Sequence, residues 1–415
     1  MELKRVVVTG IGALTPIGNT FQEYWEALTA GVSGAAPITL FDAQSFKTQF
    51  ACEVKNFDPE THFDRKEARK LDRCGQLGLV AAREAVAHSG IIESNVNKQR
   101  VGVIWGSGIG GIKTFEEEVS NFATGNGTPR FNPFFIPKMI ADITPGHISM
   151  EFGFMGPNYT TVSACASSTN ALIDSLMLIR LGKADVIVSG GSEAAVTASS
   201  IGGFNAMHAL SVRNDDPKTA SRPFDKGRDG FVMGEGSGAI ILEEYEHAKS
   251  RGATIYAEFI GGGMSADAYH LTAPHPEGLG AYNVMINALD DAQVRLDEVD
   301  HINMHGTSTP LGDIAESKAI QKLFGDHAYN IQINSTKSMT GHLLGAAGAI
   351  EAVSVVGAIM HDRVPPTINH FTDDENLDPR INYTFNQAVD KKINVAMSNT
   401  FGFGGHNACV VFRKI

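Results

Sequence analysis

The sequence has few cysteines and no long apolar run, and both shortages narrow the class of protein. Its four cysteines, Cys52, Cys74, Cys165 and Cys409, are widely spaced among 415 residues. They form neither a disulfide framework nor a paired-cysteine metal motif, so we expect a reducing compartment. The opening MELKRVVVTGIG lacks the apolar stretch of a signal peptide, and no run of about 18 uncharged apolar residues predicts a transmembrane helix. We therefore expect a soluble, cytoplasmic protein without a membrane partner.

Positive charge is also in short supply. Lysine and arginine number 34 against 46 aspartates and glutamates, which gives a formal net charge of -12. This balance disfavours general binding to nucleic acid or anionic lipid, both of which need a positive field. One basic cluster stands out, because helical spacing would place Arg65, Arg69 and Arg73 on one side. A docking patch and a solvated helix face explain this cluster equally well.

What is present is an ordinary globular composition, with 43% hydrophobic residues and 44 glycines. Short β-branched runs alternate with longer stretches that carry apolar residues at helical spacing, which predicts an α/β fold with layered sheets. The predicted strands are Arg5 to Val8, Val101 to Trp105, Val186 to Val188, Ala239 to Leu242 and Ile302 to Met304. The predicted helices are Arg69 to Ala87, Ser168 to Leu181, Gly278 to Ala292, Pro310 to Phe324 and His342 to Met360.

The chain shows signs of two similar halves. A seam falls near Ser250-Arg251-Gly252, after an amphipathic stretch and before a new strand. Each half opens with a strand followed by glycines, which suggests a duplication. We expect an N-terminal half of residues 1–252 and a C-terminal half of residues 253–415. No low-complexity linker separates them, so we expect them to pack as one body.

Cys165 lies where a β-branched strand meets an apolar-periodic helix. A thiol at a helix start lies near the positive end of the helix dipole, which favours the thiolate and lowers its pKa. The same turn presents the N–H of Cys165 to an oxyanion, as nucleophile elbows do. A lone cysteine is more often buried and structural, and Cys52, Cys74 and Cys409 keep that interpretation. Two histidines at equivalent positions make Cys165 the candidate nucleophile.

His305 is the first of these histidines. It ends a strand and precedes a helix that has Thr309 as its cap and Pro310 at its first position. In α/β sheets, ligands and chemistry collect at this edge.

His342 repeats the same plan, and we expect it to start the helix that follows. A buried Lys337 nearby would need a carboxylate such as Glu351. Either histidine alone is more often structural than catalytic, but together they share the topological position of Cys165.

Two glycine-rich loops have separate interpretations. In Ser398 to Asn407 a strand follows the glycines, which disfavours a phosphate cradle. There the N–H of Phe403 is a candidate second oxyanion donor, although a plain tight hairpin is the alternative. The loop Gly106 to Gly111 matches a dinucleotide fingerprint but lacks the acidic residue after a second strand, so we interpret it as a turn lining a pocket.

Four motifs in order, TVSACAS, HGTST, KSMTGH and GFGG, resemble the β-ketoacyl-acyl carrier protein synthases over nearly the whole chain. The closest likeness is to the elongating synthase II type of bacterial fatty-acid synthesis. The resemblance implies the thiolase fold, a duplicated αβαβα sandwich, usually as a homodimer. It implies no cofactor and no metal, and whether a monovalent cation braces the site stays open.

The resemblance also implies a reaction and its residues. Cys165 would accept a fatty acyl group from acyl carrier protein, and malonyl-carrier would then decarboxylate and condense with it. His305 and His342 would stabilise the enolate, and Lys337 and Glu351 would order the histidines. Whether either histidine also acts as a base stays open.

By the same resemblance, three residues would line or gate the acyl pocket, Ile109, Phe204 and Phe403. The docking residues for the acidic carrier would be Arg65, Lys66, Arg69 and Lys70. Two positions depart from the pattern, since His208 stands where an arginine is expected and His406 replaces a threonine. Arg213 is the candidate to compensate for His208.

Several rivals stay open. A polyketide or polyene ketosynthase would share the mechanism. A thiolase would need a second catalytic cysteine near the C-terminus, where Cys409 is poorly placed. The initiating synthase III would have asparagine where His342 stands. The non-enzymatic chain-length partner subunit of polyketide synthesis would lack Cys165, and a nucleotide-dependent oxidoreductase is the weakest alternative.

Overall fold

The computed structural model describes residues 3–415, and ten strands form its central set of hydrogen-bonded strands. They run in the order β10-β9-β13-β14-β8-β1-β7-β6-β4-β5. In the first half of the chain these are β1 (Val6–Leu14), β4 (Val101–Gly106), β5 (Asn158–Thr161), β6 (Val186–Glu193) and β7 (Gly236–Glu244). In the second half they are β8 (Ala257–Ala266), β9 (His301–Asn303), β10 (Gln332–Asn334), β13 (Val395–Gly402) and β14 (His406–Arg413).

The two sets of five strands repeat one topology. Numbered by appearance within each half, both follow the order 3-2-4-5-1, and parallel and antiparallel pairs fall at the same places. The halves meet through a short antiparallel pairing of β1 with β8, Val7 with Glu258 and Val8 with Ala257. The duplicated α/β architecture expected from the sequence is therefore present.

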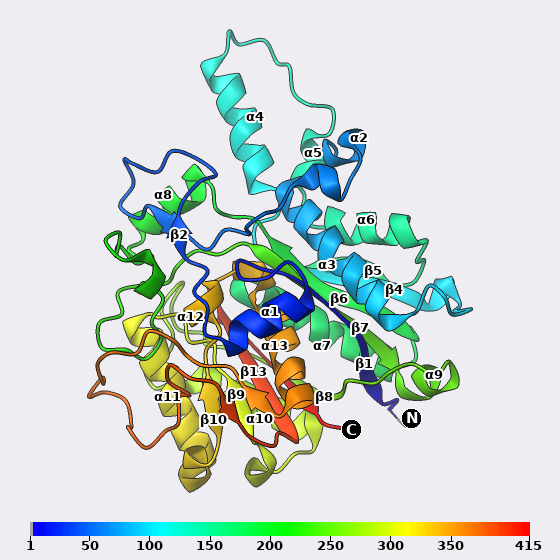
Figure 1. The fold of residues 1–415 in the computed structure, drawn as a ribbon. Coiled ribbons are helices and arrows are strands. Elements are labelled where there is room, and N and C mark those ends of the chain that lie inside the picture. Colours follow the sequence, from blue (N-terminus) through cyan, green and yellow to red (C-terminus); the bar gives the residue numbers. More distant parts are fainter. Residues whose placement is uncertain (1–2) are drawn as a thin grey trace.

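Helices form three layers around the two sets of strands (Figure 1). The middle layer holds α7 (Ser167–Arg180) and α13 (Ala347–His361), which contact each other and strands of both halves. On one outer side α3 (Arg73–Ser89) packs on β1, β6 and β7, and on the other α10 (Leu279–Ala292) packs on β8 and β14, beside α11 (Pro310–Phe324). The order of layers is αβαβα, the thiolase-like sandwich.

The remaining elements are short or peripheral. The helices are α1 (Phe21–Thr29), α2 (Arg65–Ala68), α4 (Ile112–Thr124), α5 (Phe135–Met139), α6 (Ile143–Phe152), α8 (Ala198–Ala206), α9 (Tyr245–Ser250) and α12 (Lys337–Thr340). Two small sheets pair β2 (Ala36–Pro37) with β3 (Phe50–Ala51) and β11 (Arg363–Val364) with β12 (Val389–Asp390).

The middle layer explains why α13 is apolar all round. Every residue from 347 to 359 is buried, since sheets lie on both of its sides. The segment Leu344–His361 is long and apolar enough to cross a membrane, but 89% of it is buried inside the protein. The segment therefore belongs to the protein core.

The helix predicted over Arg69 to Ala87 begins four residues later in the structure. The short helix α2 ends at Ala68, and α3 begins only at Arg73. Asp72 lies in an extended conformation and caps α3 by accepting a hydrogen bond from the N–H of Cys74. This break prevents Arg65, Arg69 and Arg73 from sharing one helix face.

Candidate active site

Cys165 lies in a 3₁₀ turn, Ala164–Ala166, between β5 and α7. The predicted strand–cysteine–helix order is therefore present. Ala164 adopts a left-handed φ of 51°, which turns the chain sharply just before the thiol. Cys165 is 7% exposed and faces a cavity.

His342 provides the nearest polar partner of the thiol, with Nε2 3.0 Å from Sγ of Cys165. The prediction that His342 starts a helix is wrong, because α13 begins five residues later at Ala347. Gly341 and Leu344 both take left-handed φ angles, 68° and 47°, which interrupt the helix. The backbone of His342 instead bridges to the segment of Val232 and Gly234, and this bridge aims its ring at Cys165.

His305 follows the C-terminal end of β9, as the sequence indicated. Its ring centroid lies 5.2 Å from that of His342, and the two rings are nearly perpendicular, at 87°. Ligand atoms of Cys165, His305 and His342 all lie within 4.8 Å of one another. Thr309 takes the N-cap position of α11, but its side chain makes no capping hydrogen bond.

Lys337 and Glu351 form a buried ion pair beneath the histidines, with side chains 2% and 1% exposed. Burial raises the pKa of Glu351 to about 7, while the Lys337 charge acts in the opposite direction. Burial also lowers the pKa of both His305 and His342 well below the usual value, and the Lys337 ammonium adds to this effect. The two histidines are therefore neutral at pH 7.

The sequence predicted a lowered pKa for the Cys165 thiol, but the structure indicates a raised one. Burial raises the pKa of Cys165 to about 12, although the Lys337 charge and the N–H groups of Phe403 and Cys165 act to lower it. Desolvation of the thiolate outweighs the favourable helix start. The resting group is a neutral thiol that needs a proton acceptor, and His342 lies at hydrogen-bonding distance.

The N–H groups of Cys165 and Phe403 lie close enough to the sulfur to lower the pKa of the thiol. The loop that carries Phe403 approaches very closely, since a Cβ at Gly402 would lie 2.7 Å from the carbonyl oxygen of Ser163. A residue with a side chain would push the loop away. The geometry thus favours two N–H donors at one point beside the thiol.

Sequence reasoning missed two buried carboxyl groups that shape the site. Glu193, at the end of β6, accepts hydrogen bonds from the N–H groups of Gly108, Ile109 and Gly345. Glu316, in α11, accepts the N–H groups of His305 and Gly306. Burial raises the pKa of each carboxyl group to about 7. An acidic residue ending the apolar run from Val186 was the signal available for Glu193.

A cavity of about 510 Å³ opens in front of the three central residues. Its lining includes Ile109, Phe204 and Phe403, the residues expected at an acyl pocket. The ring centroids of Phe204 and Phe403 lie 6.3 Å apart. The Gly106 to Gly111 turn contributes Gly108 and Ile109, so it lines a pocket as the sequence indicated.

His208 and His406, the two positions that depart from the family pattern, lie in different surroundings. His208 lines the cavity with a left-handed φ of 54°. His406 is exposed at the start of β14 and lies against Gly404. Arg213 is partly buried near Arg222 and is not among the cavity residues.

The basic cluster lies at α2 and just beyond it. Arg65, Lys66 and Arg69 are exposed, and Lys70 pairs with Glu67 at 2.6 Å. Arg73 does not belong to this surface, since Glu235 binds its guanidinium with contacts of 2.6 and 2.8 Å. Helical stacking of Arg65, Arg69 and Arg73 was thus a wrong expectation.

Among the described residues, the set suited by spacing to hold a metal ion is Cys165, His305 and His342. The same atoms are those that a thiol-based reaction would use. A thiol of pKa about 12 is a poor resting ligand, because metals bind the thiolate.

The layered fold and the Cys-His-His constellation define a thiolase-fold condensing enzyme. Family models agree, since residues 3–248 match the β-ketoacyl synthase N-terminal domain and residues 256–371 match the C-terminal domain. The chain belongs to the β-ketoacyl synthase family.

Curated relatives resemble the chain along its whole length. The 3-oxoacyl-[acyl-carrier-protein] synthase 2 of Synechocystis sp. is 49% identical and aligns with 100% of this chain and 99% of its own length. The protein of the same name from Coxiella burnetii is 49% identical, with 100% of both chains covered.

Solved structures show the same fold. The ishigamide ketosynthase/chain length factor matches with a TM-score of 0.92 and 35% identity over 100% of both chains. A type II polyketide ketosynthase in complex with its acyl-carrier protein matches with a TM-score of 0.90 and 33% identity, also over 100% of both chains.

Proposed function

We propose that this protein is a 3-oxoacyl-[acyl-carrier-protein] synthase that extends a fatty acyl chain by two carbons. The observation that carries the proposal is the contact of 3.0 Å between Cys165 Sγ and His342 Nε2, with His305 beside it at the base of an apolar cavity. The two relatives of that name, each 49% identical over the full chain, support the substrate class.

In the first half-reaction, the thiol of Cys165 attacks the thioester carbonyl of acyl-carrier. His342 Nε2 takes the thiol proton, because burial disfavours a free thiolate. The carbonyl oxygen becomes an oxyanion, which the N–H groups of Cys165 and Phe403 stabilise. Collapse breaks the bond to the carrier sulfur, which leaves with the proton, and the acyl group stays on Cys165.

In the second half-reaction, malonyl-carrier loses carbon dioxide and its electron pair forms an enolate. Neutral His305 donates an N–H to the enolate oxygen, and neutral His342 donates a second one in the tautomer that carries its proton on Nε2. The carbanion attacks the acyl carbonyl on Cys165, and the thiolate leaves and regains a proton. Lys337 and Glu351 position the histidines from below, since they are a buried pair with no access to the cavity lining.

The acyl chain would occupy the cavity beside Ile109, Phe204 and Phe403. Carrier protein is acidic, and the exposed basic residues near α2 offer it complementary charge despite the negative total. The docking residues would be Arg65, Lys66, Arg69 and Lys70. A related ketosynthase has been solved with its acyl-carrier protein, which supports such a partner.

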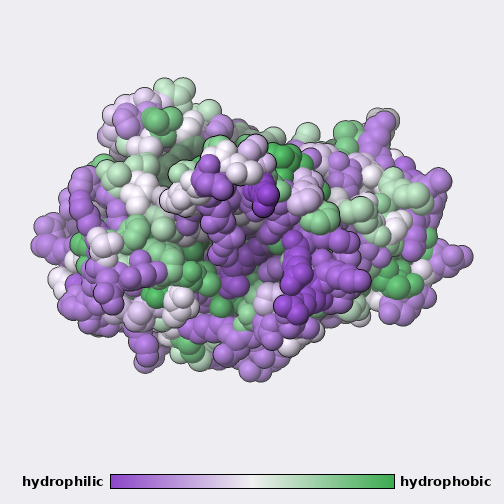
Figure 2. All heavy atoms as spheres, turned by 90° about the horizontal axis from the view of Figure 1, so that it is seen from above, coloured by the Kyte–Doolittle hydropathy of each residue, from purple (hydrophilic) through white to green (hydrophobic). Residues whose placement is uncertain are grey.

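We also propose a cytoplasmic homodimer. Strand β5 is an edge strand with exposed Tyr159, and Val162 directly after it is 62% exposed. The helix α4 projects from the body (Figure 1), and the face bearing it is largely hydrophilic with separate hydrophobic groups (Figure 2). The exposed apolar residues of this projection are Phe115, Val119, Phe122, Phe131, Phe134 and Ile136. A second copy would cover an unpaired strand edge and apolar residues that water otherwise solvates.

The boundary between the halves would fall after residue 252. The first half, residues 1–252, would hold the nucleophile Cys165, and the second, residues 253–415, would hold His305 and His342. The repeated strand order supports this division, and α9 ends at Ser250 just before it.

The second candidate is a polyketide or polyene ketosynthase of the same mechanism, which the likeness to the ishigamide and type II polyketide structures favours. A thiolase is disfavoured, because Cys409 is fully buried in β14 and does not line the cavity. A chain-length partner subunit is disfavoured by the presence of Cys165.

The decisive experiment is acyl transfer followed by mass spectrometry. Incubation with acyl-carrier should add one acyl group to Cys165, and added malonyl-carrier should then release a 3-oxoacyl product longer by two carbons. Cys165→Ala is the matched control and should show no adduct. A series of saturated and unsaturated acyl chain lengths would separate fatty-acid from polyketide roles. Absence of an adduct on the native chain would overturn the proposal.

A further inference from the structure

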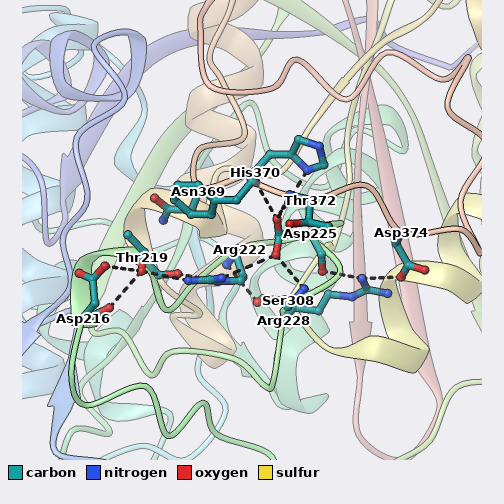
Figure 3. A network of polar contacts seen from close by, with 12 residues as sticks. Asp216, Thr219, Arg222, Asp225, Arg228, Ser308, Asn369, His370, Thr372 and Asp374 are labelled. Atoms are coloured by element: carbon teal, nitrogen blue, oxygen red, sulfur yellow. Dashed lines mark hydrogen bonds and ion pairs between the residues drawn. The ribbon is translucent and has the colours of Figure 1, made fainter.

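A network of charged side chains connects three segments that are distant in sequence, residues 222–230, 308–313 and 371–374 (Figure 3). At its centre is Arg228, whose side chain is 1% exposed. Its Nε lies 3.3 Å from a carboxylate oxygen of Asp313, and its Nη1 donates to Asp374 at 2.7 Å. A buried guanidinium with two carboxylate partners is a costly feature that needs explanation.

Arg228 also donates from Nη1 to the carbonyl oxygen of Asp225 in its own segment at 2.7 Å, and its other contacts go to the backbone of the turn after His305. Its Nε also donates to the carbonyl oxygen of Thr309 at 3.3 Å, and its Nη2 donates to that of Pro310 at 3.1 Å. Asp313 accepts the N–H of Phe224 at 3.0 Å and so also binds the segment that carries Arg228. Arg228 therefore holds the carbonyl oxygens of this turn, and Asp313 and Asp374 hold Arg228.

Ser308 shows why the turn needs holding. It adopts a left-handed φ of 68°, a conformation unfavourable for a residue with a side chain. Its hydroxyl accepts the N–H of Arg222 at 3.0 Å, and its carbonyl oxygen accepts the N–H of Gly230 at 3.1 Å. The hydroxyl and the carbonyl oxygen of this strained residue are thus both bound by the segment 222–230.

Residues 371–374 bind the segment 222–230 and hold it in place. Asp225 accepts the N–H groups of Phe371 and Thr372 at 2.7 and 2.8 Å, while Asp374 holds Arg228 itself. The segment 222–230 is consequently fixed by its contacts with residues 371–374 (Figure 3).

On the cavity side, Thr307 and Thr309 flank Ser308. Both line the cavity, and their hydroxyl oxygens lie 3.0 Å apart. Neither hydroxyl would keep its place if the backbone between them relaxed to an ordinary φ.

We propose that Arg228 is a positioning residue, which with Asp313 and Asp374 holds the Thr307–Thr309 turn in the conformation that forms the cavity wall beside His305. Arg228 itself does not touch the substrate. The inference rests on the proposed function for the assay with malonyl-carrier, but the ordering of the turn can be measured independently.

The test compares Arg228→Lys with Arg251→Lys. Lysine keeps the charge but loses the fork that reaches two carboxylates and the carbonyl oxygens of Asp225, Thr309 and Pro310. Arg251, the C-cap residue of α9, makes a similar fork with the buried Glu243 of β7, at 2.7 Å for both contacts, and neither residue lines the cavity. Asp374→Asn is a milder variant that keeps the test open if Arg228→Lys folds poorly.

For Arg228→Lys we expect the KM for malonyl-carrier to rise about ten- to a hundredfold, with a smaller change in kcat. Alkylation of Cys165 by iodoacetamide should keep its native rate, because the contact with His342 does not involve the turn. Hydrogen exchange of the segment 304–312 should quicken. Asp374→Asn should change KM and exchange in the same direction, by less, and Arg251→Lys should change neither.

An unchanged KM and unchanged exchange in Arg228→Lys and Asp374→Asn would overturn the positioning role. An equal rise in KM for Arg251→Lys would overturn it too, because the effect would then come from lost stability. If the native chain fails to condense, the proposed function falls, whereas the exchange comparison still decides whether Arg228 orders the turn.

Discussion

The two halves contain the same turn, and only one of them carries a reactive group. Ala164 and Leu344 take left-handed φ angles of 51° and 47°, and each begins a 3₁₀ turn that leads into a middle-layer helix. Cys165 follows Ala164, while Gly345 follows Leu344. The two helix starts touch, since the N–H of Ala349 donates to the hydroxyl of Ser168 at 2.9 Å.

The difference shows how a duplicated fold divides its tasks. The first turn presents a thiol to the cavity. The second turn has no space for a side chain, because a Cβ at Gly345 would lie 2.1 Å from the backbone nitrogen of Gly108. The N–H of Gly345 instead binds Glu193, which also binds the N–H groups of Gly108 and Ile109 at the cavity wall. The second half contributes instead His342 and Lys337 from the segment just before its turn.

The largest expected effects come from placing alanine in both turns. Cys165→Ala should fold with native stability and lose acyl transfer and condensation. Gly345→Ala should unfold about 3 kcal/mol more easily, because its Cβ would lie 2.1 Å from the backbone nitrogen of Gly108 and overpack the interface. Denaturant unfolding and the acylation assay measure the two effects.

Equal stability of the two alanine variants would refute this division between the turns. Cys409→Ala serves as a cysteine control, since this residue is buried in β14 away from the cavity. It should retain acyl transfer.

The next effect concerns what the second half supplies. His305→Ala and His342→Ala should each slow malonyl-carrier decarboxylation by about a hundred- to a thousandfold, because each removes one donor to the enolate oxygen. Carbon dioxide release is the measurement. His327→Ala, in a 3₁₀ turn that does not line the cavity, should release it at the native rate. Near-native release in either site variant would exclude that histidine from this step.

The smallest effect is a pH dependence that belongs to the first turn. Because burial raises the pKa of Cys165 to about 12, its thiolate fraction should grow with pH across the neutral range. Alkylation by iodoacetamide should therefore quicken about tenfold per pH unit between pH 7 and 9. A plateau below pH 8 would instead mean that the helix start stabilises the thiolate more than burial opposes it.

Local signals in the sequence were sufficient for much of the fold and part of the site. The β-branched runs from Val101 and Val186 became β4 and β6, since such runs suit strands buried on both faces. Cys165 and His305 were located because each stands between a predicted strand and a predicted helix, and the neighbouring residues indicate both elements.

The errors arose where distant contacts override local pattern. His342 was expected to begin a helix, but its backbone pairs with residues 232 and 234, more than a hundred positions earlier. Arg73 was placed with its basic neighbours, yet Glu235 binds it. Glu193 and Glu316 escaped notice, since their partners are backbone N–H groups of remote loops, which no sequence motif records.

The sequence by itself determined the alternation of strands and helices, the duplicated plan and the position of the thiol at a helix start, because propensity and periodicity act over a few residues. Only the tertiary structure decided that His342 faces that thiol, that burial opposes its ionisation and that Arg228 binds the backbone of the turn after His305. These features depend on which distant segments exclude water from one another, and that is settled by packing.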